Sequence, residues 1–220
     1  MNQKAVIQKT ANFVKEVLSD SESGHDWWHI YRVWNLSKYI AQAENVDNFT
    51  VELGALLHDI ADPKFHNGDE KIGPRKAKRF LNSLNVDEKV VTHIENIIFN
   101  ISFRGSKYIQ KFKSPELNVV QDADRLDAMG AIGIARAFVF AGYKKLKIYD
   151  PNISPNPNIN AKEYKNYKRE NYTQINHFYE KLLLLKNKMN TETGKSIAKH
   201  RHKYMEQFLD EFYKEWNGKL

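Results

Sequence analysis

Apolar residues along this chain recur at the three- to four-residue spacing of a helix, and nowhere alternate long enough to predict a strand. In residues 5–18, Val6 and Val14 fall near one stripe. Asp26 then stands where an N-cap belongs, ahead of a second apolar stripe that includes Ile40. Both stretches are therefore predicted to be amphipathic helices that bury one face.

Further helices are predicted from the same spacing, and loops from clusters of proline, glycine and asparagine. Ser114 followed by Pro115 is a favourable start for a helix over 114–129, and Asn48 is the expected cap of a helix that ends near residue 57. The other predicted helices span 75–85, 88–101, 132–143, 163–189 and 196–216, with loops at 63–74 and 150–160. We therefore expect an all-α fold in one domain, with the 150–160 loop as a flap and not a boundary.

Composition narrows the classes of function. The chain has 220 residues and no cysteine, which excludes a thiol nucleophile, a disulfide framework and a cysteine-ligated zinc site. Mean hydropathy is −0.65, and no run approaches the roughly 18 apolar residues of a membrane span. The N-terminal stretch has no signal-peptide core. We expect a cytoplasmic protein without a membrane segment.

Positive charge is concentrated toward the C-terminus. Residues 142–220 hold 16 Lys and Arg against 9 Asp and Glu, whereas residues 1–141 hold 18 of each kind. The net charge of +7 therefore belongs to the last third of the chain. Such a surface attracts phosphate-bearing ligands or nucleic acid, although an ordinary solvated surface rich in lysine has the same composition.

Three segments carry acids or imidazoles where apolar residues are expected. They contain His25, Asp26, His29 and Arg32; then His58, Asp59 and Asp62; then Asp122, Asp124 and Asp127. A buried polar group without a partner costs about 2–7 kcal/mol, so either a wet helix end or a shared cation must compensate. Simpler explanations stand for single residues: Asp26 as a helix cap, His29 as a core histidine, Asp59 as the partner of an arginine.

A shared cation would be bound by imidazole and carboxylate, without sulfur. Such a donor set favours a six-coordinate ion such as Mn²⁺, and also suits Mg²⁺, Co²⁺, Ni²⁺, Fe²⁺ or Zn²⁺. Four protein ligands would leave two positions for water or substrate, which is a catalytic and not a structural arrangement. An ion bound in this way lowers the pKa of its water and polarises a phosphoryl oxygen.

The order His29, His58-Asp59 and Asp124 resembles the H…HD…D pattern of the HD-domain metal phosphohydrolases. Four longer blocks, "GHDWWHIYRVWN", "HDIADPKFHNGDE", "QDADRLDAMGAIGIAR" and "HFYEKL…MNTETGK", are similar to those of small bacterial stand-alone HD proteins of the YpgQ type, over roughly residues 20–215. The resemblance implies an HD-domain helical bundle. Its metal core would cover about 20–145, with C-terminal helices at 160–217 packed on it.

The resemblance also implies roles for particular residues. It implies one divalent metal ion bound by His29, His58, Asp59 and Asp124. Asp124 is preferred to Asp122 and Asp127 because it stands in the tripeptide "ADR", which looks like the fourth-ligand motif of the family. Asp62 matches the acid that serves the attacking water in ppGpp-hydrolysing relatives, which makes it the expected catalytic residue.

Phosphoryl transfer also requires positive charge around the transferred group. The candidates for substrate binding are His25, Arg32, His66, His93, Lys181 and Arg201. Each has a simpler alternative as a loop, core or surface residue, and the role of His177 stays open. Trp27, Trp28, Trp34 and Phe103 are expected in the core, with stacking on a nucleobase as the alternative.

We therefore expect a divalent-metal-dependent phosphohydrolase that acts on a small phosphorylated molecule. The YpgQ-type resemblance implies hydrolysis of (deoxy)nucleoside triphosphates to monophosphate and pyrophosphate. The alternatives are ppGpp hydrolysis, nucleotidase or phosphodiesterase action, an inactive domain that keeps its metal, and a nucleic-acid-binding module built on "EYKNYKRENY", whose glutamates argue against it. The base preference, the physiological metal and the oligomeric state stay open.

Overall fold

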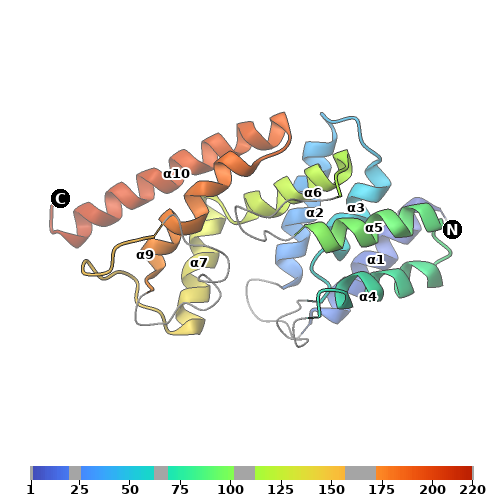
Figure 1. Cartoon of the computed structure of the whole chain (residues 1–220), viewed down its shortest axis with the longest axis horizontal. Helices are drawn as coiled ribbons and strands as arrows, with labels where there is room; N and C mark the ends of the chain where they lie inside the picture. The colour runs from blue at the N-terminus through green and yellow to red at the C-terminus, as the bar shows by residue number, and fades with distance from the viewer. Residues whose placement is uncertain (1, 20–25, 62–68, 102–111, 157–171, 220) are drawn as a thin grey trace. The chain divides into compact units, whose positions relative to one another are not determined.

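The computed structural model describes residues 2–19, 26–61, 69–101, 112–156 and 172–219. Within these residues the fold is all-α (Figure 1), as the apolar spacing predicts, apart from an isolated bridge between Lys147 and Thr173. The described residues form two compact units, one up to Ala123 and one from Asp124 onward, and each is described by itself. The single domain predicted over 1–220 stays a prediction.

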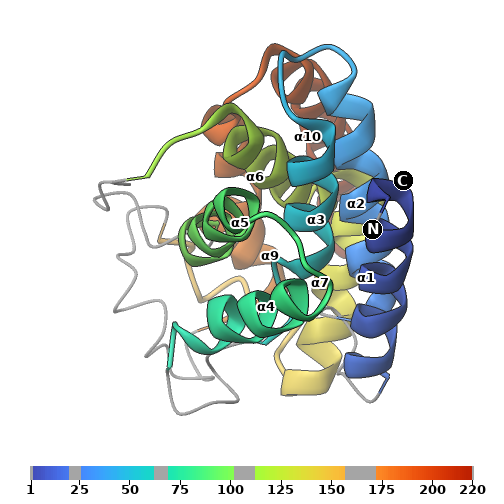
Figure 2. The same ribbon diagram turned by 90° about the vertical axis from the view of Figure 1, so that its right-hand side faces the viewer.

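The first unit is a helical bundle arranged around α3. Its elements are α1 (Gln3–Val17), α2 (Trp27–Ala41), α3 (Asn48–Leu57), α4 (Ile72–Ser83), α5 (Glu88–Asn100) and the start of α6 (Pro115–Asp127). Helix α3 packs against α1, α2 and α5, and α5 also packs against α4 (Figure 2). Leu53, Leu56 and Leu57 on α3 are fully buried. The apolar face predicted for this segment is therefore the centre of the unit.

Helices α3, α5 and α6 approach one another closely at Gly54. A Cβ atom added there would lie 3.3 Å from side-chain atoms of Ile97 and 3.5 Å from Val120. Both contacts are at or inside ordinary van der Waals distance, so a larger residue at this position would require its neighbours to move. Gly54 lies about one turn before His58, and the close approach therefore fixes the helices next to the predicted metal ligands.

Two predicted helix starts are confirmed by their caps. The Asp26 carboxylate accepts the His29 N–H at 2.9 Å, and the Ser114 hydroxyl accepts the Leu117 N–H at 3.0 Å. Asn48 as the cap of α3 is wrong by one residue, because Asp47 accepts the backbone N–H of Thr50 at 3.1 Å. The loop predicted at 63–74 ends earlier than expected, because α4 already begins at Ile72 and holds a proline in its first turn.

The second unit contains the end of α6 and the later helical segments. They are α7 (Gly130–Lys144), α9 (Gln174–His177), the π-helical turn η3 (Phe178–Leu182), the 3₁₀ segment η4 (Leu183–Lys188) and α10 (Glu192–Trp216). Helix α10 packs on α7 and η4, and α7 also contacts α9. The helix predicted at 196–216 is confirmed but starts earlier, because Thr191 caps it by accepting the Gly194 N–H at 2.9 Å.

The helix predicted at 163–189 is only partly confirmed. Residues 163–171 lie outside the described residues. Within the described part, Thr173 caps a new helix by accepting the Asn176 N–H at 3.2 Å, and the chain then winds as π and 3₁₀ turns before residue 189. The apolar spacing identifies the helical segment here but does not reveal the change in winding.

The helices predicted at 114–129 and 132–143 are confirmed as α6 and α7, with a bend of 65° between them. Gly130 at the bend has φ +69°, a conformation that favours glycine. No single helix in the described part of the chain is both long and apolar enough to span a membrane; α6 and α7 reach that length and apolarity only as a bent pair.

Candidate metal centre

Three of the predicted metal ligands come from the ends of adjacent helices. His29 lies in the first turn of α2, behind the Asp26 cap, and is 1% exposed. His58 is the C-cap residue of α3 and is 8% exposed, and Asp59 follows it with partial exposure. Since α2 packs against α3, the start of one helix and the end of the other bring these residues together.

The two imidazoles face each other through their Nε2 atoms. His29 Nε2 lies 3.3 Å from His58 Nε2, and the rings meet edge to face at 72°. Asp59 joins them, because one ligand atom from each of the three side chains lies within 4.8 Å of the others. The described residues therefore contain a buried cluster of two imidazoles and a carboxylate.

The hydrogen bond to Nδ1 of His58 defines its tautomer. Nδ1 lies 2.8 Å from the carbonyl oxygen of Ala55. A carbonyl can only accept, so Nδ1 carries the proton and Nε2 of the neutral ring presents a lone pair toward His29. A ring nitrogen held in this way by a second hydrogen bond is the usual arrangement of a metal-binding histidine.

The three side chains fit a divalent ion. Metal–ligand bonds of about 2.1 Å place two ligand atoms at right angles roughly 3.0 Å apart, close to the 3.3 Å between the two Nε2 atoms. The donors are nitrogen and oxygen without sulfur, which suits Mn²⁺ and the other ions named above. His29, His58 and Asp59 are therefore the residues that could hold the ion.

A contact that the sequence does not reveal fixes α2 against α3. The indole Nε1 of Trp34 donates to Glu52 Oε2 at 2.8 Å. Trp34 follows His29 by five residues and Glu52 precedes His58 by six, so this bond lies about one and a half turns from the cluster on each helix. No local sequence pattern indicates this pair, since 18 residues separate its members.

The fourth predicted ligand, Asp124, lies on α6 at the beginning of the second unit, and its ligand role stays a prediction. Of the neighbouring acids, Asp127 is 3% exposed and accepts from Arg136 Nη1 at 2.8 Å. That ion pair gives Asp127 a structural role, which supports the choice of Asp124. Asp122 is fully buried.

Three predicted site residues lie outside the described residues, namely His25, Asp62 and His66. Of the other cations, Arg32 lies on α2 about one turn beyond His29 and is partly exposed. Lys181 lies in the π-helical turn η3. The substrate-binding roles of all these residues stay predictions.

Arg201 is not the surface residue that the simpler alternative expects. Its Nη1 donates at 2.5 Å to the carbonyl oxygen of Leu126, in the last turn of α6. Burial lowers the pKa of the Arg201 guanidinium, and the nearby Asp127 carboxylate partly opposes that effect. A cation at this place stabilises the carbonyl end of α6, and a phosphate contact by Arg201 stays a prediction.

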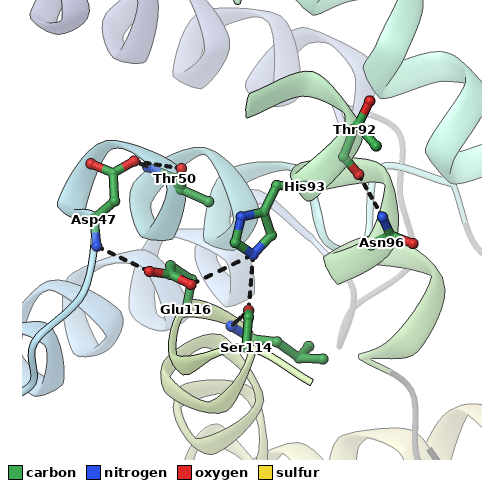
Figure 3. A network of polar contacts seen from close by, with 8 residues as sticks. Asp47, Thr50, Thr92, His93, Asn96, Ser114 and Glu116 are labelled. Carbon is green, nitrogen blue, oxygen red and sulfur yellow. Dashed lines mark hydrogen bonds and ion pairs between the residues drawn. The ribbon is translucent and has the colours of Figure 1, made fainter. Parts of the chain in front are cut away.

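His93 belongs to a polar network on α5 (Figure 3). Its Nε2 lies 2.9 Å from Ser114 Oγ and 3.5 Å from Glu116 Oε2, while Glu116 Oε1 accepts the backbone N–H of Asp47 at 3.1 Å. Asp47 starts α3 and His58 ends it, so roughly 15 Å of helix separates the two. A substrate contact by His93 stays a prediction.

The expectation that the tryptophans lie in the core is wrong for Trp28. Trp28 is 60% exposed and meets Tyr31 edge to face at 5.8 Å between ring centroids. It lies on the face of α2 that is opposite the buried stripe containing Ile30 and Val33. Phe103 lies outside the described residues.

Known proteins are similar to this chain in sequence and in fold. The sequence profile of the HD domain matches residues 27–129. The protein YpgQ of Bacillus subtilis is 36% identical over 219 residues, which cover 99% of this chain and 97% of YpgQ. An HD-superfamily hydrolase from Bacillus thuringiensis is 42% identical, with a TM-score of 0.78 over 98% of this chain and 99% of that one.

A crystal structure of Bacillus subtilis YpgQ in complex with ADP has a TM-score of 0.76, at 33% identity over 98% of this chain and 97% of that one. The helical fold, the His29, His58 and Asp59 cluster, and these full-length similarities agree with one another. The chain belongs to the HD domain family and has the fold of the HD-superfamily hydrolases.

Proposed function

We propose that this protein is a divalent-metal-dependent phosphohydrolase that cleaves (deoxy)nucleoside triphosphates to the monophosphate and pyrophosphate. The observation that carries the proposal is the buried pair of facing Nε2 atoms, 3.3 Å apart, beside Asp59. Two imidazole nitrogens and a carboxylate oxygen that lie within 4.8 Å of one another are the donor types and the spacing that a divalent ion requires.

Each residue of the cluster has a defined task in the proposal. His58 binds through Nε2 while its Nδ1 stays on the Ala55 carbonyl, which fixes the tautomer and the orientation of the ring. His29 and Asp59 complete one face of the site. When bound, the ion supplies Lewis acidity toward a phosphoryl oxygen and lowers the pKa of water. The other residues of the chain position the substrate and the attacking water.

Two further roles rest on the sequence pattern. We propose Asp124 as the fourth ligand, since it stands in the "ADR" tripeptide and Asp127 is occupied by Arg136. We propose that Asp62, three residues after Asp59, accepts the proton of the attacking water. Lys181 and Arg32 are the proposed partners of the phosphates.

The choice of a nucleotide rests on the relative that binds one. The structure of Bacillus subtilis YpgQ in complex with ADP has the same fold and covers nearly the whole chain. Together with the excess of positive charge in residues 142–220, this supports a phosphate-rich nucleotide as the substrate. A cytoplasmic location remains part of the proposal.

A nucleotide panel tests the reaction. The purified protein is incubated with Mn²⁺ and the eight common ribo- and deoxyribonucleoside triphosphates, ppGpp, and an aryl phosphodiester, and both products are identified. Monophosphate with pyrophosphate is the expected pair. Release of inorganic phosphate from the triphosphates, or turnover of ppGpp alone, would contradict the pyrophosphohydrolase proposal in favour of another HD phosphohydrolase activity.

Metal analysis tests the site independently of turnover. His58→Ala and Asp124→Ala are each expected to lose stoichiometric Mn²⁺ and activity, because each removes a direct ligand. His200→Ala, which removes an exposed histidine on α10, is the matched control and should bind Mn²⁺ as the parent does. Retention of the metal by both ligand variants would mean that the ion binds elsewhere.

A further inference from the structure

We propose that Glu116 is a positioning residue that sets helix α6 against helix α3, and thereby aligns the acidic segment of α6 with the histidine cluster. Glu116 lies in the first turn of α6, whereas the "QDADRLD" acids lie in its second half. Its effect on the metal would therefore pass through the helix and not through direct contact. The inference rests on the proposed function, because it assumes that Asp124 is a ligand.

Glu116 uses both of its carboxylate oxygens to join three helices (Figure 3). Oε1 accepts the backbone N–H of Asp47 at 3.1 Å, and Oε2 lies 3.5 Å from His93 Nε2 on α5. Its side chain is only 13% exposed. A carboxylate held at two points and largely shielded from water is more constrained than an ordinary surface glutamate.

The partners of Glu116 are themselves the caps of the helices that it joins. Asp47 caps α3 by accepting from the backbone N–H of Thr50 at 3.1 Å and from its hydroxyl at 2.5 Å. Ser114 caps α6 through the Leu117 N–H at 3.0 Å and contacts His93 at 2.9 Å. The network therefore links the two points at which α3 and α6 begin.

Two contacts further along α6 complete its attachment to the first unit. Val120 packs at the close approach around Gly54 of α3. Gln121 Nε2 donates to the carbonyl oxygen of Asn100, at the end of α5, at 3.0 Å. Glu116 fixes the start of α6, and these two residues fix its middle, so both the axial position and the rotation of the helix are defined.

A helix defined in this way transmits a displacement along its length. One residue of slip moves every later side chain by about 1.5 Å and turns it by about 100°. Either change would remove a carboxylate from bonding distance of an ion, since metal–oxygen bonds tolerate only a few tenths of an ångström. Loss of the Glu116 link is therefore expected to weaken metal binding more than its effect on stability alone would explain.

A second interhelical link in the same unit provides the matched control. Lys78 on α4 bonds Glu88 and Glu95 of α5, each at 3.0 Å. This link also joins helices through a charged side chain, but neither α4 nor α5 carries a predicted metal ligand. Lys78→Ala therefore reports the effect of losing an interhelical link without changing the alignment of the ligand-bearing helices.

The experiment measures Mn²⁺ affinity and thermal unfolding of the full chain, without nucleotide, for three variants. Glu116→Ala is expected to weaken Mn²⁺ binding by about 10-fold, the lower end of the loss that follows removal of a direct hydrogen-bond partner of a metal ligand. Glu116→Gln is expected to recover most of that affinity, because its amide oxygen can still accept the Asp47 N–H. Lys78→Ala is expected to keep its Mn²⁺ affinity within about twofold while lowering the unfolding temperature.

Three results would overturn the inference: parental Mn²⁺ affinity in Glu116→Ala, an equal loss in Lys78→Ala, or a loss in Glu116→Gln as large as in Glu116→Ala. If Glu116→Ala does not fold, Glu116→Asp takes its place, since it shortens the side chain and breaks the link while keeping the charge, and unchanged affinity would again overturn it. Retention of metal by Asp124→Ala marks failure of the proposed function instead.

Discussion

At the residue scale, the candidate metal centre consists of three side chains and of the backbone carbonyl that orients one of them. His29, His58 and Asp59 follow from their order and from their apolar neighbours, and the structure brings them together. The Ala55 carbonyl that orients His58 lies one helical turn earlier and was within reach of sequence reasoning. The role of Glu52 cannot be predicted from the sequence, because its partner Trp34 comes from another helix.

Asp62 is the residue whose proposed role differs most sharply from that of a ligand. Asp62→Asn is expected to keep stoichiometric Mn²⁺ but to lower kcat by about 10²–10⁴, because the amide cannot accept a proton from water. Metal analysis and steady-state kinetics on the same preparation check both parts. Loss of the metal along with activity would make Asp62 a ligand, and unchanged kcat would remove it from the mechanism.

The pH dependence of stability tests whether His177 is buried in its uncharged form. The Tyr172 hydroxyl oxygen lies 2.5 Å from His177 Nδ1, and burial, followed by the charge of Lys181, lowers the pKa of His177 to about 3 from the ordinary 6.5. Between these two values the unfolded chain binds a proton that the folded chain does not. The free energy of unfolding should therefore fall as the pH drops from about 6.5 toward 3, by up to about 1.4 kcal/mol per pH unit from this group.

Urea unfolding of the parent and of His177→Gln at pH 7, 6, 5 and 4 isolates this contribution, because glutamine does not titrate. The stability of the variant should depend less steeply on pH below 6.5 than that of the parent. Parallel curves would show that His177 takes up its proton equally in the folded and unfolded chains.

At the scale of the element, helix positions are predicted well because their signals are local. The Asp26 and Ser114 caps and the apolar stripes act within a few residues. The π and 3₁₀ turns at Phe178–Leu182 and Leu183–Lys188 were not predictable, since their winding depends on packing against α10 and not on a local pattern. The start of α3 was misplaced because Asp47 and Asn48 are both good caps.

The bend between α6 and α7 depends on small residues. A Cβ atom at Gly133 would lie 2.3 Å from the backbone oxygen of Ala128, so backbone must shift to admit it. Gly133→Ala is expected to lower the free energy of unfolding by about 1–3 kcal/mol. Gly142→Ala, on the same helix with no atom within 4 Å of the added Cβ, should be neutral or stabilising by up to about 1 kcal/mol.

Chemical denaturation of the two glycine variants gives the comparison directly. The reverse order of stability, or equal stability, would show that the bend adjusts without cost and that Gly133 is not required for it. Because both substitutions add the same methyl group to α7, helix propensity cancels between them.

At the scale of the whole molecule, the sequence predicts the distribution of charge but not the long-range contacts. The excess of positive charge lies after residue 141, and the proposed ligands lie before it. The Asp47–Glu116 bond joins residues 69 positions apart, and no local pattern indicates such a pairing. The division into two units was likewise not predicted, since no linker composition marks residues 123 and 124.

A variant of Lys181 tests whether the positive charge after residue 141 binds the phosphates of the substrate. If Lys181 binds the phosphates that leave as pyrophosphate, Lys181→Ala should lower kcat/KM for triphosphates by about 10–100-fold, since a charge-assisted hydrogen bond contributes roughly 1.5–3 kcal/mol. Cleavage of an aryl phosphodiester, which lacks those phosphates, should change far less. Steady-state kinetics on both substrates measures the difference.

Lys214→Ala is the control for net charge, because Lys214 is an exposed lysine of α10 that pairs with the nearby Glu211. It should leave both activities unchanged. An equal loss on both substrates in Lys181→Ala would assign Lys181 to the fold or the metal site, and the charge after residue 141 would then be ordinary solvated surface.

The Asp47–Glu116 bond has a consequence for biosynthesis. Both histidines and Asp59 belong to the first 59 residues of the chain, whereas Glu116 and the rest of α6 come more than 50 residues later. At about 5–20 residues per second, the ribosome needs roughly 3–11 seconds to add that stretch. During this interval the nascent chain holds its two imidazoles and Asp59 without helix α6, so a site that includes Asp124, as proposed, could form only after α6 leaves the exit tunnel.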